Sequence, residues 1–230
     1  MSILKEGFPF IFPSFAIGLA LAAVSRFTTS APLSITCISI GVLFVVFALF
    51  CMFFFRDPKI TITQEQDAIL SPCNGTVMEV TEESNEGRDE KVIRVFLSVF
   101  SVHLQRSPVS GTVTDVTHKD GKFLAAWDPR AHIENEQNIF TIQSDGVNTV
   151  DGVNTVNGVY TVRQIAGLIA RRCVSWVKAG DVLKAGDKIG MIKFSSQVDL
   201  HLPKSTLIKV KPGDKVKAGI TIMAQNKVSC

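Results

Sequence analysis

The sequence predicts a mainly β domain preceded by an α-helical membrane hairpin, and two observations point to this fold class. Residues 7–24 and residues 32–55 form two long apolar runs without a charged residue. From residue 59 onward the chain is instead rich in Val, Ile and Thr. Gly, Asp and Pro interrupt it about every eight to twelve residues, as in β-sandwiches and barrels. We therefore expect two domains, residues 1–58 and residues 59–230.

The two apolar runs predict a pair of helices. A helix of about 20 apolar residues spans a bilayer core, so the second run is long enough and the first is marginal. Residues 25–31 read SRFTTSA and form a natural polar turn between them. A cleaved signal peptide fits poorly, because a second apolar run follows where a polar mature start is needed. A buried apolar hairpin in a soluble protein is the alternative interpretation.

Basic residues beside the apolar runs predict the orientation of the hairpin. Lys5, Arg56 and Lys59 flank its outer ends, and Arg26 lies in the turn. Because positively charged flanks favour the cytoplasmic side, this distribution places both termini in the cytoplasm. The expected location is therefore a membrane, with the β domain on the cytoplasmic side.

The β-rich part is predicted to fold as a series of short strands separated by turn residues. Strands are expected at residues 75–80, 91–99, 111–116, 139–143, 160–166, 188–193, 198–202 and 221–224. One helix is expected as well, within residues 125–133 or within residues 167–174.

A short tandem repeat lies between two of these strands. Residues 145–150 and 151–156 both read DGVNTV, and residues 157–162 follow as NGVYTV. Asp-Gly and Asn-Gly favour tight turns, and lengthening a loop costs little free energy. We interpret the repeat as a duplication that lengthens a surface hairpin.

A second repeat predicts the architecture of the β domain more closely. Residues 177–187 and residues 210–219 each contain a Gly-Asp turn, a short strand and a Lys-Ala-Gly turn. These units resemble the half-barrels of biotinyl and lipoyl carrier domains, whose fold is a barrel-sandwich hybrid. Such carriers present a lysine for modification, and the local lysine here is Lys193, which lacks the neighbours that those carriers use.

Composition argues against two classes of function. The net charge of +3 is small, and no basic stripe with interleaved aromatic residues is present, so no nucleic-acid partner is predicted. The five cysteines show no Cys-x-x-Cys spacing, and two of them lie in the second apolar run. The sequence therefore predicts neither a disulfide framework nor a metal site.

A pair of serines near the C-terminus is the candidate for covalent chemistry. Ser195 and Ser196 lie in the segment KFSSQVDLHLP, residues 193–203, which is strand-like. A serine hydroxyl beside a strained peptide can attack the preceding carbonyl and convert the amide into an ester. β-Elimination and loss of ammonia then leave an N-terminal pyruvoyl group, an electron sink made from the protein itself. A plain strand serine is the alternative interpretation.

Nearly the whole chain resembles, in order, the phosphatidylserine decarboxylase proenzyme family in its short bacterial form. The most specific segments are QIAGLIARR at residues 164–172 and the Ser-x-Val-Asp-x-x-x-Pro ending at residues 196–203. Further matches are KEG at residues 5–7, FFRDP at 54–58, SPCNG at 71–75, VFSVHLQRSPVSG at 99–111, GKFL at 121–124 and NEQN at 135–138.

This resemblance implies a proenzyme that cuts itself between Ser195 and Ser196, so that Ser196 becomes the pyruvoyl group of the smaller chain. That group would form a Schiff base with phosphatidylserine, release CO2 and give phosphatidylethanolamine, with no external cofactor. The resemblance also implies that His103 transfers protons, a task for which the pKa of imidazole is suited. The family's aspartate that orients this histidine corresponds to Asn74.

Three positions depart from the family pattern. Ser195 stands where the family usually has glycine, Asn74 replaces an aspartate, and Ser101 replaces the aspartate two residues before the histidine. Two alternative functions are therefore kept beside the decarboxylase. One is a processing-deficient, non-catalytic relative that retains the fold, and the other is a membrane-anchored carrier or adaptor built on the barrel-sandwich repeat.

The resemblance also implies partners and a location. The partners are phosphatidylserine in a membrane and the large and small chains of one precursor, and homo-oligomerisation is left open. The membrane is expected to be the bacterial inner membrane. Arg171 and Arg172 either hold a phosphate or carboxylate or face anionic lipid. His118, His132 and His201 are expected to be surface or packing residues.

Overall fold

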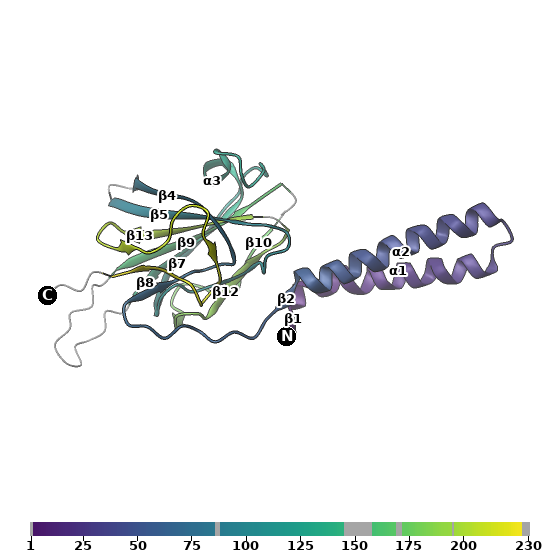
Figure 1. Ribbon diagram of the computed structural model, residues 1–230, viewed down its shortest axis with the longest axis horizontal. Coiled ribbons are helices and arrows are strands. Elements are labelled where there is room, and N and C mark those ends of the chain that lie inside the picture. Colours follow the sequence, from purple (N-terminus) through teal and green to yellow (C-terminus); the bar gives the residue numbers. More distant parts are fainter. Residues whose placement is uncertain (1, 86–87, 145–157, 169–171, 195, 227–230) are drawn as a thin grey trace. The chain divides into compact units, whose positions relative to one another are not determined.

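The structure is a computed structural model that divides into two compact units, Met1–Lys59 and Ile60–Cys230. It describes residues 2–85, 88–144, 158–168, 172–194 and 196–226. Figure 1 shows a helical hairpin in the first unit and a curled arrangement of strands in the second. The predicted mainly β fold with an N-terminal helical hairpin is thus confirmed. The DGVNTV copies at residues 145–156 lie outside the described residues.

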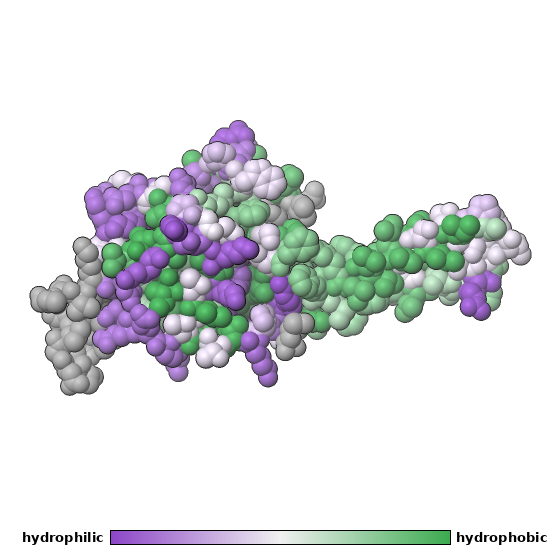
Figure 2. All heavy atoms as spheres, in the orientation of Figure 1, coloured by the Kyte–Doolittle hydropathy of each residue, from purple (hydrophilic) through white to green (hydrophobic). Residues whose placement is uncertain are grey.

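The first unit is built on two antiparallel helices, α1 (Phe8–Phe27) and α2 (Ala31–Phe54), which lie side by side (Figure 1). A short 3-10 helix, η1 (Lys5–Gly7), precedes them. Both long helices have the length and composition needed to cross a membrane. Most of their large apolar side chains are exposed, and Figure 2 shows an apolar surface along the hairpin with polar residues at its turn. Such a surface suits lipid better than water.

Small residues let the two helices approach closely. A Cβ atom on Gly18 would lie 3.0 Å from the carbonyl oxygen of Gly41, and one on Gly41 would lie 3.0 Å from the carbonyl oxygen of Gly18. Ser14 and Cys37, each four residues earlier on its helix, are also buried. This spacing of small residues is typical of helix pairs packed in membranes.

The two ends of the hairpin are tied together outside the helices. Strand β1 (Ser2–Ile3) pairs with β2 (Arg56–Asp57) in antiparallel register. The backbone N–H of Leu4 also donates to the carbonyl of Phe55 at 2.9 Å. The chain therefore enters and leaves the hairpin at one place.

The second unit is a set of antiparallel sheets. Within the described residues the largest sheet has the strand order β11-β7-β8-β9-β13-β5-β4-β15, and two smaller sheets have the orders β10-β12-β6 and β14-β16-β3. The strands of the large sheet are β4 (Gly75–Asn85), β5 (Arg88–Leu97), β7 (Gly111–Lys119), β8 (Gln137–Gln143), β9 (Val159–Ala166), β11 (Val182–Leu183), β13 (Ser196–Pro203) and β15 (Lys215–Val216). The others are β3 (Ala68–Leu70), β6 (Leu104–Arg106), β10 (Cys173–Ser175), β12 (Lys188–Ile192), β14 (Leu207–Ile208) and β16 (Ile222–Gln225).

Each predicted strand coincides with an observed one, although the observed bounds differ by up to several residues. The short strands, such as β6 and β11, were not predicted, because two or three residues carry no alternation of apolar and polar side chains. The helix observed is a single turn, α3 (Ala131–Glu134), which overlaps the end of the first of the two expected regions. The segment that carries α3 lies over the large sheet near β4 and β5 (Figure 1).

The second sequence repeat is an internal structural repeat. Its four turn glycines, Gly180, Gly186, Gly213 and Gly219, all have positive φ, between 68° and 94°, a region open to glycine but costly for other residues. The short strands that follow the Gly-Asp turns, β11 and β15, then pair with the first residues of β7 and β4.

Each copy of this repeat also contacts a Ser-Pro-x-x-Gly segment elsewhere in the chain. Residues 177–187 contact residues 107–111, and residues 210–219 contact residues 71–75. The N–H of Gly219 donates to the carbonyl of Ser71 at 2.9 Å, and the N–H of Gly186 donates to the carbonyl of Ser107 at 2.8 Å. Sequence analysis had noted both segments but not their equivalence. The two copies, each with its Ser-Pro-x-x-Gly segment, thus form two similar halves of the repeat.

Replacing Gly18 by leucine should destabilise the helical hairpin. The added side chain would meet Val45 and the Gly41 carbonyl, and such overpacking typically costs about 1–3 kcal/mol. The purified full chain can be titrated with a denaturing detergent and its helicity followed by circular dichroism. The midpoint of helix loss should occur at a lower fraction of the denaturing detergent in the variant than in the natural chain. Ala20→Leu, at an exposed position on the same helix, should leave the midpoint unchanged. Equal midpoints for the two variants would contradict the close packing.

Candidate active site

Ser196 is the first residue of a strand that is paired on both sides. In the large sheet it lies opposite Leu97 of β5 and opposite Ala166 of β9. It is fully buried, and its Oγ has no hydrogen-bond partner among the described residues. A buried hydroxyl without a partner is costly and uncommon in folded proteins. Structural hydrogen bonding therefore does not account for this serine.

The link before Ser196 has an unusual backbone conformation. Residues 193–195 join β12 to β13, and Phe194 has φ of +56°. A bulky residue in the left-handed region costs about 1–3 kcal/mol. Ser195 itself lies outside the described residues. Strain is thus stored two residues before Ser196, next to the predicted cut.

His103 and Ser196 lie at the same end of the large sheet. The N–H of Ile192 donates to the carbonyl of His103 at 3.1 Å, and β12 pairs with β6 directly beyond this bond. Residues 98–103 therefore run from Leu97, which is opposite Ser196, to His103, which is beside Ile192. Ile192 and Ser196 flank the link of residues 193–195. The segment of residues 98–103 and this link therefore begin and end beside each other.

The geometry of His103 fixes its tautomer. The ring is buried, with 1% of the residue exposed, and its Nδ1 lies 3.0 Å from the carbonyl oxygen of Ser101. A carbonyl can only accept, so Nδ1 carries the proton and Nε2 of the neutral ring is an acceptor. An imidazole held in this way can act as a general base through Nε2.

Asn74 is the third candidate, and no hydrogen bond joins its side chain to His103 within the described residues. It is half-buried in the connection from β3 to β4, and its side chain forms no hydrogen bond within the described residues. Its loop borders β6, since the N–H of Arg106 donates to the carbonyl of Pro72 at 2.8 Å. The structure thus brings Asn74 near the other candidates without joining it to His103, and its role stays a prediction.

Sequence analysis missed a buried chain of amides on the same side as Ser196. Gln164 Nε2 donates to Gln105 Oε1 at 2.8 Å, and Asn138 Nδ2 donates to Gln164 Oε1 at 3.0 Å. His118 Nδ1 lies 2.7 Å from Asn138 Oδ1 at the outer end of the chain. The amides join β6 to β9 and β8, so they hold the strand that follows His103 against the large sheet. Polar residues within apolar strands are the only sequence signal of this bridge.

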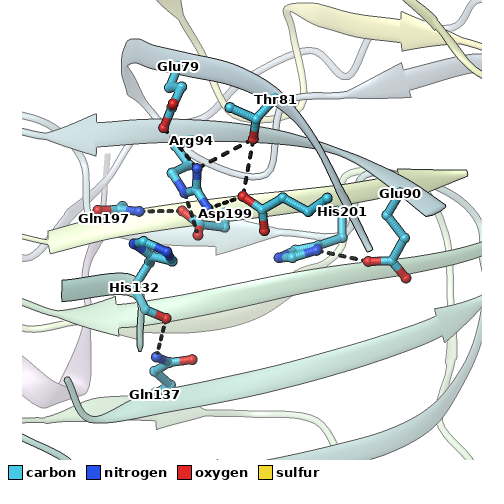
Figure 3. A network of polar contacts seen from close by, with 10 residues as sticks. Glu79, Thr81, Glu90, Arg94, His132, Gln137, Gln197, Asp199 and His201 are labelled. Carbon is cyan, nitrogen blue, oxygen red and sulfur yellow. Dashed lines mark hydrogen bonds and ion pairs between the residues drawn. The ribbon is translucent and has the colours of Figure 1, made fainter. Parts of the chain in front are cut away.

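The opposite face of β13 carries a second missed feature, a buried ion cluster around Arg94 (Figure 3). Arg94 Nη1 lies 2.8 Å from Glu79 Oε2, Arg94 Nη2 pairs with Glu83, and Arg94 Nε lies 3.4 Å from Asp199 Oδ2. Gln197 Nε2 donates to Asp199 Oδ1 at 2.6 Å. The Arg94 and Asp199 side chains are 8% and 2% exposed.

This cluster joins β13 to its neighbour β5 and to β4, the next strand beyond β5. Burial raises the pKa of Asp199 above its ordinary value, and it outweighs the opposing effects of Gln197 and Arg94. On the same face His201 Nδ1 lies 3.0 Å from Glu90 Oε2, within hydrogen-bond distance in a largely buried contact. His201 thus forms a specific polar contact in addition to the packing role that sequence analysis expected. Figure 3 shows His132 of α3 beside the cluster.

Two cationic residues are joined by a backbone hydrogen bond at the link that precedes Ser196. The N–H of Lys193 donates to the carbonyl of Arg172 at 3.2 Å, and Arg172 is exposed. Lys193 is half-buried in the link between two strands, a poor position for the modified lysine of a carrier domain. Arg171 lies outside the described residues.

No group of three or more His, Cys, Asp or Glu residues is placed to hold a metal ion in the described part of the chain. Together with the hairpin, these features define a protein with two long apolar helices and, at the start of a central strand, a buried serine whose hydroxyl has no partner among the described residues.

Comparisons with known proteins give the family. A family model described as phosphatidylserine decarboxylase matches residues 47–224, well over half of the chain. The chain belongs to the phosphatidylserine decarboxylase family, as its motifs had suggested.

Relatives match the chain over nearly its whole length. A phosphatidylserine decarboxylase proenzyme of Burkholderia ambifaria (strain MC40-6) is 39% identical over 225 residues, which are 97% of this chain and 95% of that protein. One of Geotalea uraniireducens (strain Rf4) is 38% identical over 224 residues, which are 96% and 95% of the two chains. One of Symbiobacterium thermophilum is 38% identical over 226 residues, with coverage of 97% and 95%.

Replacing Arg94 by methionine should strongly destabilise the β unit. The change leaves the buried carboxylate of Asp199 without its cation, and breaking a buried ion pair in this way costs about 3–5 kcal/mol. The free energy of unfolding can be measured by urea denaturation of the full chain in detergent, followed by tryptophan fluorescence.

The matched control for this prediction is Arg130→Met. Arg130 pairs with Asp128 at 3.0 Å, but its side chain is 63% exposed, and exposed ion pairs contribute at most about 1 kcal/mol. A loss of similar size in the two variants would show that the Arg94 cluster does not support the fold.

Proposed function

We propose that this chain is a proenzyme that cuts itself between Ser195 and Ser196 and then decarboxylates phosphatidylserine to phosphatidylethanolamine. The observation that carries the proposal is the Ser196 hydroxyl, which is fully buried and has no partner among the described residues. It follows a link in which Phe194 has a left-handed backbone. Membership of the phosphatidylserine decarboxylase family supports the substrate.

In the proposed cut, Ser196 Oγ attacks the carbonyl carbon of Ser195 and gives up its proton to a base. The C–N bond then breaks, the nitrogen of residue 196 takes a proton, and the amide has become an ester. Removal of the Cα proton of residue 196 breaks its Cβ–Oγ bond, releases the carboxylate of Ser195 and leaves a dehydroalanine that tautomerises to an imine. Addition of water and loss of ammonia leave a ketone at residue 196.

His103 is the proposed base for the first proton transfer. The hydrogen bond to the Ser101 carbonyl keeps the proton of the neutral ring on Nδ1, so that Nε2 is the acceptor. Cleavage would also release the strained link, since Phe194 no longer has to connect β12 to β13. Both features favour the forward reaction.

The start of β13 fits a pyruvoyl group. Leu97 and Ala166 enclose residue 196 on both sides, so water has little access to a reactive carbonyl there. When formed, the group supplies a ketone that binds the substrate amine and accepts the electron pair released with CO2. We propose that His103 returns a proton to the substrate carbon, which completes the net exchange of CO2 for a proton.

The proposed location follows from the hairpin. Two apolar helices anchor the chain in the bacterial inner membrane, and the β unit lies on the cytoplasmic side. A phospholipid substrate then reaches the enzyme without leaving the bilayer.

Replacing Ser196 by alanine should abolish both the cut and the decarboxylation, because the attacking oxygen is lost. Intact mass analysis of the purified natural chain should show a fragment of residues 196–230 with a blocked N-terminus that reacts with hydroxylamine or borohydride. Neither this fragment nor CO2 release from labelled phosphatidylserine should appear with Ser196→Ala.

Ser205→Ala is the control, since Ser205 lies exposed in the same C-terminal segment. It should leave the fragment and the activity unchanged. An uncut natural chain that releases no CO2 would refute the proposed activity.

A processing-deficient relative is the second candidate, and a specific observation favours it. Asn74 stands at the family's aspartate position, and its side chain makes no hydrogen bond to His103 in the described structure. Unlike an aspartate, asparagine carries no charge that could stabilise a protonated imidazole. Ser195 also replaces a glycine, which would have a wider choice of backbone conformations for the attack.

The double variant Ser195→Gly with Asn74→Asp separates the two candidates. If the natural chain is a competent proenzyme, it cuts itself and the double variant only changes the rate. If it is processing-deficient, residues 196–230 are released only from the variant. The released fraction can be followed by intact mass over time. Ser110→Asp is the control, because Ser110 occupies the position equivalent to Asn74 in the other half of the repeat.

A further inference from the structure

Gln105 of β6 is a buried side chain with no part in the chemistry proposed above. The residue is fully buried, and its Nε2 has no hydrogen-bond partner among the described residues. Buried polar groups are rarely left in this state, because an unpaired donor loses its water without gaining a partner. Structural hydrogen bonding therefore accounts for the oxygen of this amide but not for its nitrogen, just as it does not account for the Ser196 hydroxyl.

The orientation of the Gln105 amide is fixed by its neighbours. Gln164 Nε2 lies 2.8 Å from Gln105 Oε1 and 3.4 Å from the carbonyl oxygen of Val174. A backbone carbonyl can only accept, so this end of Gln164 is the donor. Its other end, Oε1, accepts from Asn138 Nδ2 at 3.0 Å. Gln105 therefore presents its oxygen to Gln164, and the N–H groups of its Nε2 stay available.

Gln164 brings Gln105 to the face of the large sheet that carries Ser196. In the ladder between β9 and β13, Gln164 is opposite Val198 and Ala166 is opposite Ser196. Residues two apart on a strand share a face, so Ser196 and Gln164 are diagonal neighbours on one face. Long side chains reach across such a diagonal. The amide of Gln105 is thus bonded to a side chain that lies within reach of Ser196.

Strand β12 joins the same two residues by a second path. Gln105 pairs with Gly190 of β12, and a Cβ atom on Gly190 would lie 2.8 Å from Gln164 Nε2. β12 therefore passes directly against the two bonded amides, where it has no room for a side chain. Two residues later β12 ends at Ile192, and the link that follows returns to Ser196. The amide pair, the end of β12 and the start of β13 thus border one region of the interior.

The oxygen of Ser196 becomes charged at one step of the proposed cut. During the attack, Oγ gives electron density to the carbonyl carbon of residue 195, so a donor to Oγ helps little. In the elimination the Cβ–Oγ bond breaks, and its electron pair moves onto Oγ, which becomes an oxygen of the new carboxylate. A fixed N–H group beside that atom stabilises the developing charge more than it stabilises the ester.

We propose that Gln105 Nε2 donates a hydrogen bond to the Ser196 oxygen as that oxygen leaves as a carboxylate, and so promotes the elimination step of self-processing. The inference rests on the proposed function and deepens it, because it adds a side chain with its own task to Ser196 and His103. Gln105 transfers no proton in this step. The contact is absent from the uncut chain and forms as the charge develops, as is common for catalytic hydrogen bonds.

Gln105→Met and Gln105→Leu test this role in the full chain. Both remove the N–H groups, and methionine keeps the length of the side chain. Elimination should slow roughly a hundredfold while the attack does not, so the ester should accumulate. Hydroxylamine added to denatured samples cleaves that ester and releases a fragment of residues 196–230 that begins with an unmodified serine. Intact mass over time distinguishes this fragment from the pyruvoyl fragment.

Asn138→Leu is the matched control. It removes another buried amide of the same chain but leaves Gln164 bonded to Gln105 and in contact with the Val174 carbonyl. This variant should lower the free energy of unfolding, measured by urea denaturation, without accumulation of the ester. Its rate of pyruvoyl formation should stay within about twofold of the natural rate, because the Gln105 donor is retained.

The outcomes separate the role of Gln105 from the proposed function. A natural chain that gives neither the fragment nor the ester would refute both. Formation of the pyruvoyl fragment by the natural chain, with no ester in either Gln105 variant, would overturn the role of Gln105 alone. Equal slowing in Gln105→Met and Asn138→Leu without the ester would also overturn it, and would assign the amides to the fold. Lower CO2 release per pyruvoyl group without the ester would overturn it as well, and would assign Gln105 to the substrate.

Discussion

The two-sided pairing of β13 is the constraint on which the site depends. Antiparallel ladders to β5 and β9 fix the register of this strand, and the register places Ser196 between Leu97 and Ala166. A shift by one residue would move Ser196 to the face of Arg94 and bring Gln197 to the core side. The ion pair of Asp199 with Arg94 opposes such a shift. Since β13 would belong to the smaller chain after a cut, the same ladders and ion cluster would also hold the two products together.

The internal repeat explains how such a site arises on a symmetric scaffold. The N–H of Ile192 donates to the carbonyl of His103 at 3.1 Å, and in the other half the N–H of Asn226 donates to the carbonyl of Asp67 at 3.1 Å. The two halves thus share this backbone arrangement but differ in the side chains there. In the half that contains Ile192, the accepting residue is a histidine. In the same half, residues 193–195 lead from Ile192 to a central strand that begins with a serine. The same backbone geometry thus occurs in both halves of the repeat, whereas the candidate catalytic residues lie in one.

The sequence predicted those features that depend on local patterns. Uncharged runs predicted α1 and α2, alternation predicted the long strands, and the strand-like segment placed Ser196 at a strand. It did not predict the amide bridge through Gln105 or the cluster around Arg94. Both depend on which strands become neighbours, and that is decided by long-range packing. Alternation did place Gln197 and Asp199 on one face, but a buried cation on another strand gives no local signal.

Asn74 and Ser101, which stand where the family has aspartates, leave the orientation of His103 in place but carry no charge. Its Nδ1 is held by a backbone carbonyl in a tight turn, which the N–H of Ser101 closes by donating to the carbonyl of Ser98 at 2.8 Å. A side-chain substitution cannot remove that acceptor, so the tautomer survives the loss of both aspartates. A neutral carbonyl, however, stabilises an imidazolium less than a carboxylate does. The asparagine and the serine at these positions therefore leave the Nδ1 contact of His103 in place, but neither can offer the carboxylate that the family's aspartates carry.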